Sequence, residues 1–196
     1  MIQKVIRHSL PSRIIYHLKL GKDDAGSSII SRKFFEGISL LKFKSPVTKK
    51  SPKIYLIKHK DEIVYVGFTT DSISNRLRTG LAPGRYIKDD IDPSEGSHGY
   101  HGYKWKVLEE VDLYVWVFEG IELPKEKEKL DPVKQMFENI EAEMVFQIKQ
   151  QTGRWPKYQS EIHFYSLFDG HELYSSIRYF GMNEKEIALK ILHDLL

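Results

Sequence analysis

The 196-residue sequence contains no cysteine. Disulfide bonds, thiolate nucleophiles and cysteine metal ligands are therefore excluded, and the composition suits a reducing cytoplasm. The chain also lacks any apolar run close to the ~20 residues that a membrane-spanning helix needs. Its first ten residues, MIQKVIRHSL, have no continuous apolar core of the kind found in signal peptides. We therefore expect a cytoplasmic protein that does not associate with membranes.

A large excess of charge of one sign is missing as well. The chain has 30 Lys and Arg against 27 Asp and Glu, a net charge of +3. This weak positive balance permits nucleic-acid binding without demanding it, so the positions of the charges matter more than their sum. Hydrophobic residues make up 41% of the chain and charged residues 29%, which is typical of a globular protein rather than a disordered one.

The clearest pattern in the sequence lies between Lys53 and Gly80. Two short runs rich in Ile, Val and Tyr flank a charged segment at residues 58–62. Alternating apolar and polar residues around such a segment predict a β-hairpin, with strands near 53–58 and 62–67.

A helix is expected to follow the hairpin directly. Hydroxyl and carboxylate side chains at residues 69–72 are suitable N-caps, so the helix is predicted near 71–79. One strand–turn–strand–helix unit then carries two tyrosines, Tyr55 and Tyr65, and an arginine, Arg76.

Two later segments complete the predicted core. Residues 112–119 are apolar on both faces, which indicates a strand buried on both sides. A second helix is expected near 132–151, with Asp131 as its N-cap and Pro132 at its first position. The sequence therefore predicts an α+β fold with a three-stranded antiparallel sheet flanked by helices.

Glu141 interrupts the apolar stripe of the second predicted helix. The stripe is formed by residues at helical spacing: Phe137, Ile140, Met144, Val145 and Ile148. A charged residue on an apolar face is costly unless it has a partner, so Glu141 is the candidate for a functional role. The alternative is that Glu141 pairs with a structural Arg or Lys. Glu143 lies off the stripe and is expected to face solvent.

The remaining segments flank or interrupt this core. We expect an N-terminal extension at 1–50, a core at 51–164 with an inserted loop at 81–103, and a C-terminal helical extension at 165–196. Residues 13–20 fit either a strand or a short helix. The basic, proline-containing segment 42–52 is expected to be a solvent-facing linker, with a basic arm on a nucleic-acid backbone as the alternative.

The stretch around the hairpin resembles the GIY-YIG nuclease family, and the resemblance covers roughly residues 51–160. Lys53-Ile54-Tyr55 matches the first family motif, and Tyr65-Val66-Gly67 matches the second. Arg76 matches the arginine of the following helix, and Glu141 the glutamate of a later helix. Lys53 departs from the family pattern, because the first motif usually has glycine there. The layout resembles most the restriction endonucleases of the family, which are small, with insertions around the core and short terminal extensions.

The resemblance implies a stand-alone, divalent-metal-dependent endonuclease that hydrolyses phosphodiester bonds of double-stranded DNA, with a type II restriction enzyme as the narrower expectation. Glu141 would bind Mg²⁺ or Mn²⁺, and Arg76 would neutralise charge on the phosphoryl oxygens. Tyr55 would take a proton from the attacking water. Tyr65 would hydrogen-bond the phosphate or the nucleophile.

Further candidates surround this catalytic set. His59 and His101 are alternative proton carriers, because histidine titrates near neutral pH. Glu143 is the alternative metal ligand, and Gln159 is the nearest counterpart of a polar residue that follows the glutamate helix in the family. The other supporting and nucleic-acid-binding candidates are all cationic: Lys53, Arg78, Arg85, Lys88, Lys104 and Arg154.

Two other functions stay open at this point. The first is a nucleic-acid-binding module that keeps the fold but has lost cleavage, as the lysine at position 53 would allow. The second is a repair nuclease that depends on a partner protein. The sequence does not decide between DNA and RNA, nor whether the protein forms a homodimer.

Overall fold

The computed structural model describes residues 10–22, 28–30, 43–81, 105, 108–121, 123, 127–159 and 183–196. These residues form an α+β fold, as expected. The strands are β1 (Arg13–Lys22), β2 (Ser28–Ile30), β3 (Lys53–His59), β4 (Glu62–Thr69) and β5 (Glu110–Val117). The helices are α1 (Ile73–Leu81), α2 (Lys127–Thr152) and α3 (Glu184–Leu192).

The sheet is antiparallel and has four main strands in the order β1-β5-β3-β4, with the short β2 paired to the far end of β1. The three predicted strands are present as β3, β4 and β5, but the prediction of a three-stranded sheet was wrong because β1 adds a strand beside β5. Every second residue of β1 from Ile14 to Leu20 packs on the sheet's core. That period of two is typical of a strand and settles the question left open for residues 13–20.

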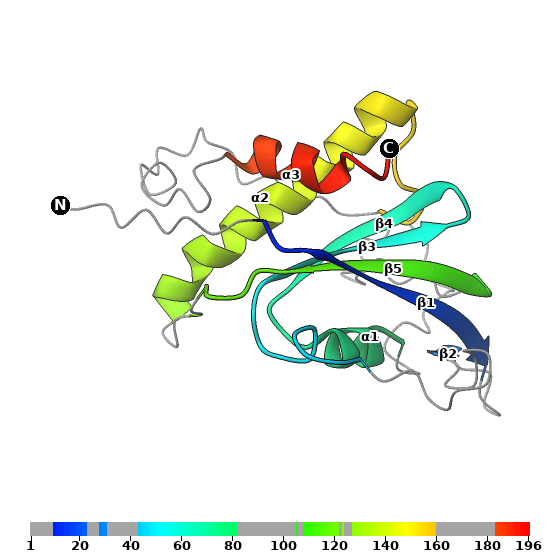
Figure 1. Ribbon diagram of the computed structural model, residues 1–196, viewed down its shortest axis with the longest axis horizontal. Coiled ribbons are helices and arrows are strands. Elements are labelled where there is room, and N and C mark those ends of the chain that lie inside the picture. The colour runs from blue at the N-terminus through cyan, green and yellow to red at the C-terminus, as the bar shows by residue number, and fades with distance from the viewer. Residues whose placement is uncertain are drawn as a thin grey trace, which may run out of the picture.

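The sheet separates two apolar cores. α2 and α3 lie on one face of the sheet and α1 lies on the other (Figure 1). The core beneath α2 and α3 includes Ile54, Leu56, Val66, Trp116, Phe137 and Ile191. The core beneath α1 includes Tyr55, Tyr65, Ile73, Leu77, Trp105 and Val115. The side chains of β3 and β5 alternate between these cores, which explains why both strands are apolar on both faces.

The helix boundaries follow local signals only in part. Ser72 caps α1 as predicted, since the backbone N–H of Asn75 donates to its Oγ at 3.1 Å. The predicted start of the second helix at Asp131-Pro132 was wrong, because α2 begins at Lys127. Residues 127–130 are Lys, Glu, Lys and Leu, which are strong helix formers, so the helix extends a further turn toward the N-terminus.

The segments next to the core are tied to it. The linker before β3 has exposed lysines at 49 and 50, as expected, but Val47 is buried in the α1-side core. The backbone N–H of Ile73 donates to the carbonyl of Val47 at 3.0 Å. At the other end of the chain, Asn183 caps α3, in a reciprocal pair of hydrogen bonds with Glu186. None of the helices in the described ranges is long and apolar enough to cross a membrane.

Candidate active site

The first element of the candidate site is the contact between Tyr55 and Gly67. The two residues are partners across the β3–β4 ladder, and the tyrosine ring lies directly over the glycine. A Cβ atom at residue 67 would lie 2.5 Å from the Tyr55 hydroxyl oxygen and 2.8 Å from a ring carbon. Only glycine fits at such a close approach, which gives a physical reason for the glycine of the Tyr65-Val66-Gly67 motif.

Tyr65 and Arg76 join Tyr55 on the same face of the sheet. The centroids of the two tyrosine rings are 5.9 Å apart. Arg76, in the first turn of α1, donates from Nε to the Tyr55 hydroxyl at 3.3 Å. Both tyrosines are almost fully buried, with exposed fractions of 0% and 1%. The hairpin and the helix after it therefore bring these three side chains together, as the sequence predicts.

Glu141 approaches this group from the opposite side of the sheet. α2 and α1 cover different faces, but β4 is the last strand on its side of the sheet. The carboxyl of Glu141 lies at this edge, where the backbone N–H of Phe68 and the side chain of Gln159 hydrogen-bond to it. The positive charge of Arg76 acts on the same carboxyl. Arg76 therefore connects the two sides, by a hydrogen bond to the Tyr55 hydroxyl and by its charge acting on the Glu141 carboxyl.

Gln159 connects the edge of β4 to the segment after α2. The backbone N–H of Val66 donates to Gln159 Oε1 at 3.0 Å, so the amide nitrogen of Gln159 is left to donate to Glu141. The backbone N–H of Tyr158 donates to the carbonyl of Val64 at 2.9 Å. Along an antiparallel edge strand, every second residue directs its backbone groups away from the sheet. In β4 the outward-facing backbone groups belong to residues 64, 66 and 68. They hydrogen-bond to Tyr158, Gln159 and Glu141 respectively.

The carboxyl of Glu141 is strongly perturbed. Burial raises its pKa from 4.5 to about 8, and the nearby Glu138 adds to the rise. Arg76, Gln159 and the Phe68 backbone lower the pKa but do not offset the burial. The carboxyl therefore carries a proton near neutral pH, and a bound cation would replace that proton.

A divalent cation at this site would be held by the carboxylate of Glu141 and by water. Mg²⁺ is commonly held by one or two carboxylates and several waters, and Glu141 offers one carboxylate. Within the described part of the chain, no three His, Asp or Glu side chains are grouped so that they could hold a metal ion. Glu141, with water ligands, is thus the residue that would hold it.

Two alternative candidates lie away from the site. Glu143 is two residues along α2 from Glu141, a rotation of about 200° around the helix, so the two carboxylates do not face the same neighbours. His59 is four residues along β3 from Tyr55, about 13 Å away. Its Nδ1 lies 2.9 Å from the backbone carbonyl of Glu110.

Lys53, the departure from the family motif, has a structural role. Its side chain is fully buried, and its Nζ donates to three backbone carbonyls: Lys49 at 2.7 Å, Ser51 at 2.8 Å and Asp71 at 2.9 Å. Burial lowers its pKa to about 8, while the charge of Asp71 raises it. The ammonium group therefore joins the segment before β3 to the start of α1, and none of these three contacts involves the tyrosines.

The remaining predicted residues divide into two groups. Arg154 is described and exposed, with its Nη1 3.2 Å from Glu62 Oε1. Arg85, Lys88, His101, Lys104 and the side chain of Arg78 lie outside the described residues. Trp155, which is 50% exposed beside Arg154, was not among the predicted site residues. The sequence feature that could have indicated Trp155 is the mixture of cationic and aromatic residues at 154–158.

Comparisons with protein-family models, with curated proteins and with solved structures found no match to this chain. The likeness to GIY-YIG nucleases therefore rests on the ordered residues Tyr55, Tyr65, Gly67, Arg76 and Glu141.

Proposed function

We propose that this protein is a divalent-metal-dependent endonuclease of the GIY-YIG type that hydrolyses phosphodiester bonds of double-stranded DNA, most like the type II restriction enzymes of that family. One observation supports the proposal above the others. Arg76, on the helix α1, hydrogen-bonds to the Tyr55 hydroxyl, and its charge also acts on the carboxyl of Glu141, which comes from α2 on the opposite face of the sheet.

Each of these residues has a distinct role in the proposed reaction. Arg76 neutralises the charge that develops on the phosphoryl oxygens. Tyr55 acts as the base in its phenolate form, after its hydroxyl has released its own proton to solvent, and then accepts the proton of the attacking water. The Arg76 Nε–H that donates to the Tyr55 oxygen fixes its position. Tyr65, whose ring contacts that of Tyr55, hydrogen-bonds the phosphate or the nucleophile.

Glu141 would hold the Mg²⁺ or Mn²⁺ ion, which supplies Lewis acidity and lowers the pKa of bound water. Gln159 and the Phe68 backbone orient the carboxyl by hydrogen bonds. Because the carboxyl must lose its proton to bind a cation, metal affinity should increase with pH up to about 8, the pKa of Glu141.

The test is cleavage of plasmid DNA in the presence of Mg²⁺ by the wild type, Glu141→Gln and Arg76→Ala. Glu141→Gln should abolish cleavage and leave DNA affinity nearly unchanged, because the amide keeps the shape but does not recruit the cation. Arg76→Ala should also lose cleavage, but it should in addition weaken DNA binding and reduce the salt dependence of binding by about one unit of slope.

Glu143→Gln is the matched control, since it removes the neighbouring carboxylate from the same helix and should cleave like the wild type. Loss of cleavage in Glu143→Gln with full activity in Glu141→Gln would move the metal role to Glu143. A Glu141→Gln variant that fails to fold would assign Glu141 to the structural ion pair with Arg76.

The second candidate function is a nucleic-acid-binding module without cleavage. It is favoured by the burial of Tyr55 and Tyr65 and by the three partners that already engage the Glu141 carboxyl. A wild-type protein that binds DNA but does not cut it with Mg²⁺ or Mn²⁺ would establish this second function and exclude the first.

A further inference from the structure

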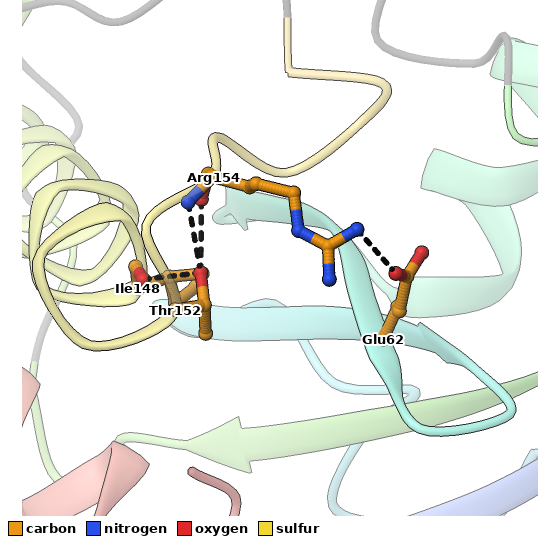
Figure 2. Close-up of polar contacts among 4 residues, drawn as sticks. All are labelled: Glu62, Ile148, Thr152 and Arg154. Atoms are coloured by element: carbon orange, nitrogen blue, oxygen red, sulfur yellow. Dashed lines mark hydrogen bonds and ion pairs between the residues drawn. The ribbon is translucent and has the colours of Figure 1, made fainter.

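The segment that follows α2 is held firmly against the protein. Thr152 Oγ1 lies 2.7 Å from the carbonyl of Ile148 and accepts from the backbone N–H of Arg154 at 3.3 Å. Arg154 then reaches across to Glu62 at the start of β4 (Figure 2). Lys149 Nζ donates to the carbonyl of Gly153 at 2.5 Å. The chain from 152 to 159 is therefore fixed to both α2 and β4.

This fixed segment presents an exposed tryptophan. Trp155 is 50% exposed, while the next residue, Pro156, is buried. Lys149 Nζ lies 5.9 Å from the centroid of the Trp155 ring, and Lys157 Nζ lies 5.4 Å from that of Tyr158. A large aromatic surface left open to water on a rigid support is the arrangement that proteins use to stack a ligand ring.

We propose that Trp155 is a stacking platform for an unpaired base of nucleic acid, with Lys149, Arg154 and Lys157 contacting the flanking phosphates. The identity of the ligand rests on the proposed function, which makes nucleic acid the substrate. When a nucleic-acid strand lies along the edge of β4, one of its bases stacks on Trp155, and that base either leaves the duplex or belongs to a single-stranded stretch.

The charges around Trp155 agree with this ligand. Three cationic side chains occur within nine positions of sequence, from Lys149 to Lys157. Single-stranded nucleic acids are bound by just this combination of cations along the backbone and aromatic rings beneath the bases. An acidic or purely apolar partner would use either the charges or the ring, but a nucleotide uses both.

The position of the platform relative to the candidate active site also agrees. Tyr158 and Gln159 pair with Val64 and Val66 of β4, and Gln159 bonds directly to Glu141. Trp155 is four residues before Gln159 in the same ordered segment. A base stacked there would therefore belong to a nucleotide close to the phosphate that meets Arg76 and Glu141.

The protein's own fluorescence can test the proposal. The chain has three tryptophans. Trp105 and Trp116 are 0% and 4% exposed, so Trp155 is the one that a ligand can reach. Addition of a 12-nucleotide single-stranded DNA should quench the fluorescence of the wild type. Trp155→Phe should remove the quenching but keep most of the affinity, because phenylalanine still stacks.

Affinity measurements separate stacking from charge. Trp155→Ala should weaken binding of the 12-mer about 5- to 100-fold, the range of base–aromatic stacking, with an unchanged salt slope. An abasic strand of equal length should bind the wild type and Trp155→Ala equally. Lys157→Gln should instead lower the salt slope by about one for both strands. Leu189 is also apolar and exposed but lies on α3, so Leu189→Ala is the control and should change neither the affinity for the 12-mer nor the salt slope.

These outcomes separate the platform from the proposed cleavage. Wild-type affinity in Trp155→Ala, or binding of the 12-mer without quenching, would overturn the platform even if the protein cleaves DNA. Quenching and base-dependent binding without any cleavage would support the platform and exclude the nuclease. Absence of quenching by any nucleic acid, with quenching by a protein partner instead, would also overturn the proposal.

Discussion

At the scale of single residues, the approach of Tyr55 to Gly67 makes a sharp prediction. Gly67→Ala would place a methyl group against the ring of Tyr55, which is fully buried. We expect a loss of about 1–3 kcal/mol in the free energy of unfolding, the usual range for overpacking. Chemical denaturation measures this loss, and cleavage assays should show that the displaced ring also lowers activity.

Gly153→Ala is a suitable comparison for this variant. Gly153 has a positive φ of 75°, and an added Cβ would meet nothing within 4 Å. The expected loss is about 1 kcal/mol, from backbone strain alone. Equal stability of Gly67→Ala and the wild type would show that the Tyr55 ring is not fixed where it lies over the glycine.

The perturbed carboxyl of Glu141 predicts a dependence of stability on pH. The folded protein keeps the proton up to about pH 8, whereas the unfolded chain releases it near 4.5. The folded state therefore binds more protons between these values, so the free energy of unfolding should fall as pH rises from 4.5 to 8. One proton sets the maximum slope of this contribution at about 1.4 kcal/mol per pH unit.

The difference between the wild type and Glu141→Gln isolates this contribution. Glutamine does not titrate, so the variant should gain on the wild type as pH rises from 4.5 to 8, and the gain should level off above 8. Denaturant titrations at several pH values measure it. Lys53 affects stability in a different pH range. Its pKa is 10.5 in the unfolded chain and about 8 in the folded protein, so the unfolded state binds more protons between these values and the free energy of unfolding should rise from pH 8 to 10.5. A constant difference between the two proteins would contradict the raised pKa of Glu141.

At the scale of elements, the edge of β4 depends on Gln159. Its side chain serves two partners at once, the backbone N–H of Val66 and the carboxyl of Glu141. The element that positions the candidate metal ligand is therefore the short segment after α2 as much as α2 itself.

Gln159→Ala should destabilise the protein by about 1–2 kcal/mol, because a buried N–H loses its acceptor. It should also raise the pKa of Glu141 further, because one hydrogen bond to the charged form is lost. Thermal unfolding reports the first effect. The pH dependence of metal binding, which should shift to higher pH, reports the second. Gln151→Ala, at an exposed position on the last turn of α2, is the control. An unchanged pH dependence in Gln159→Ala would separate Gln159 from Glu141.

At the scale of the whole molecule, sequence patterns predicted the elements whose signals are local. The hairpin, the cap of α1 at Ser72 and the apolar strand β5 all follow from neighbouring residues. The choice of Glu141 over Glu143 also came from a local pattern, the apolar stripe of one helix. These predictions needed only the periods of strands and helices and the chemistry of caps.

Features that depend on distant segments were not predictable in the same way. β1 joins the sheet beside β5, nearly a hundred residues later in the chain, and no short pattern encodes that pairing. Lys53 is buried because carbonyls from two other segments surround its ammonium group. Gln159 reaches Glu141 only because the chain turns back along β4 after α2. Trp155 is notable for its exposure, which the sequence alone does not give.

The capped edge of β4 also has a consequence for how molecules of this protein meet one another. The strand EIVYVGFT is apolar and rich in β-branched residues, and an open edge of this kind pairs readily with copies of itself into aggregates. Glu141, Tyr158 and Gln159 occupy three backbone groups on this edge, those of Phe68, Val64 and Val66 respectively. The side chain proposed to hold a cation therefore also blocks one position at which a second copy of the strand would pair.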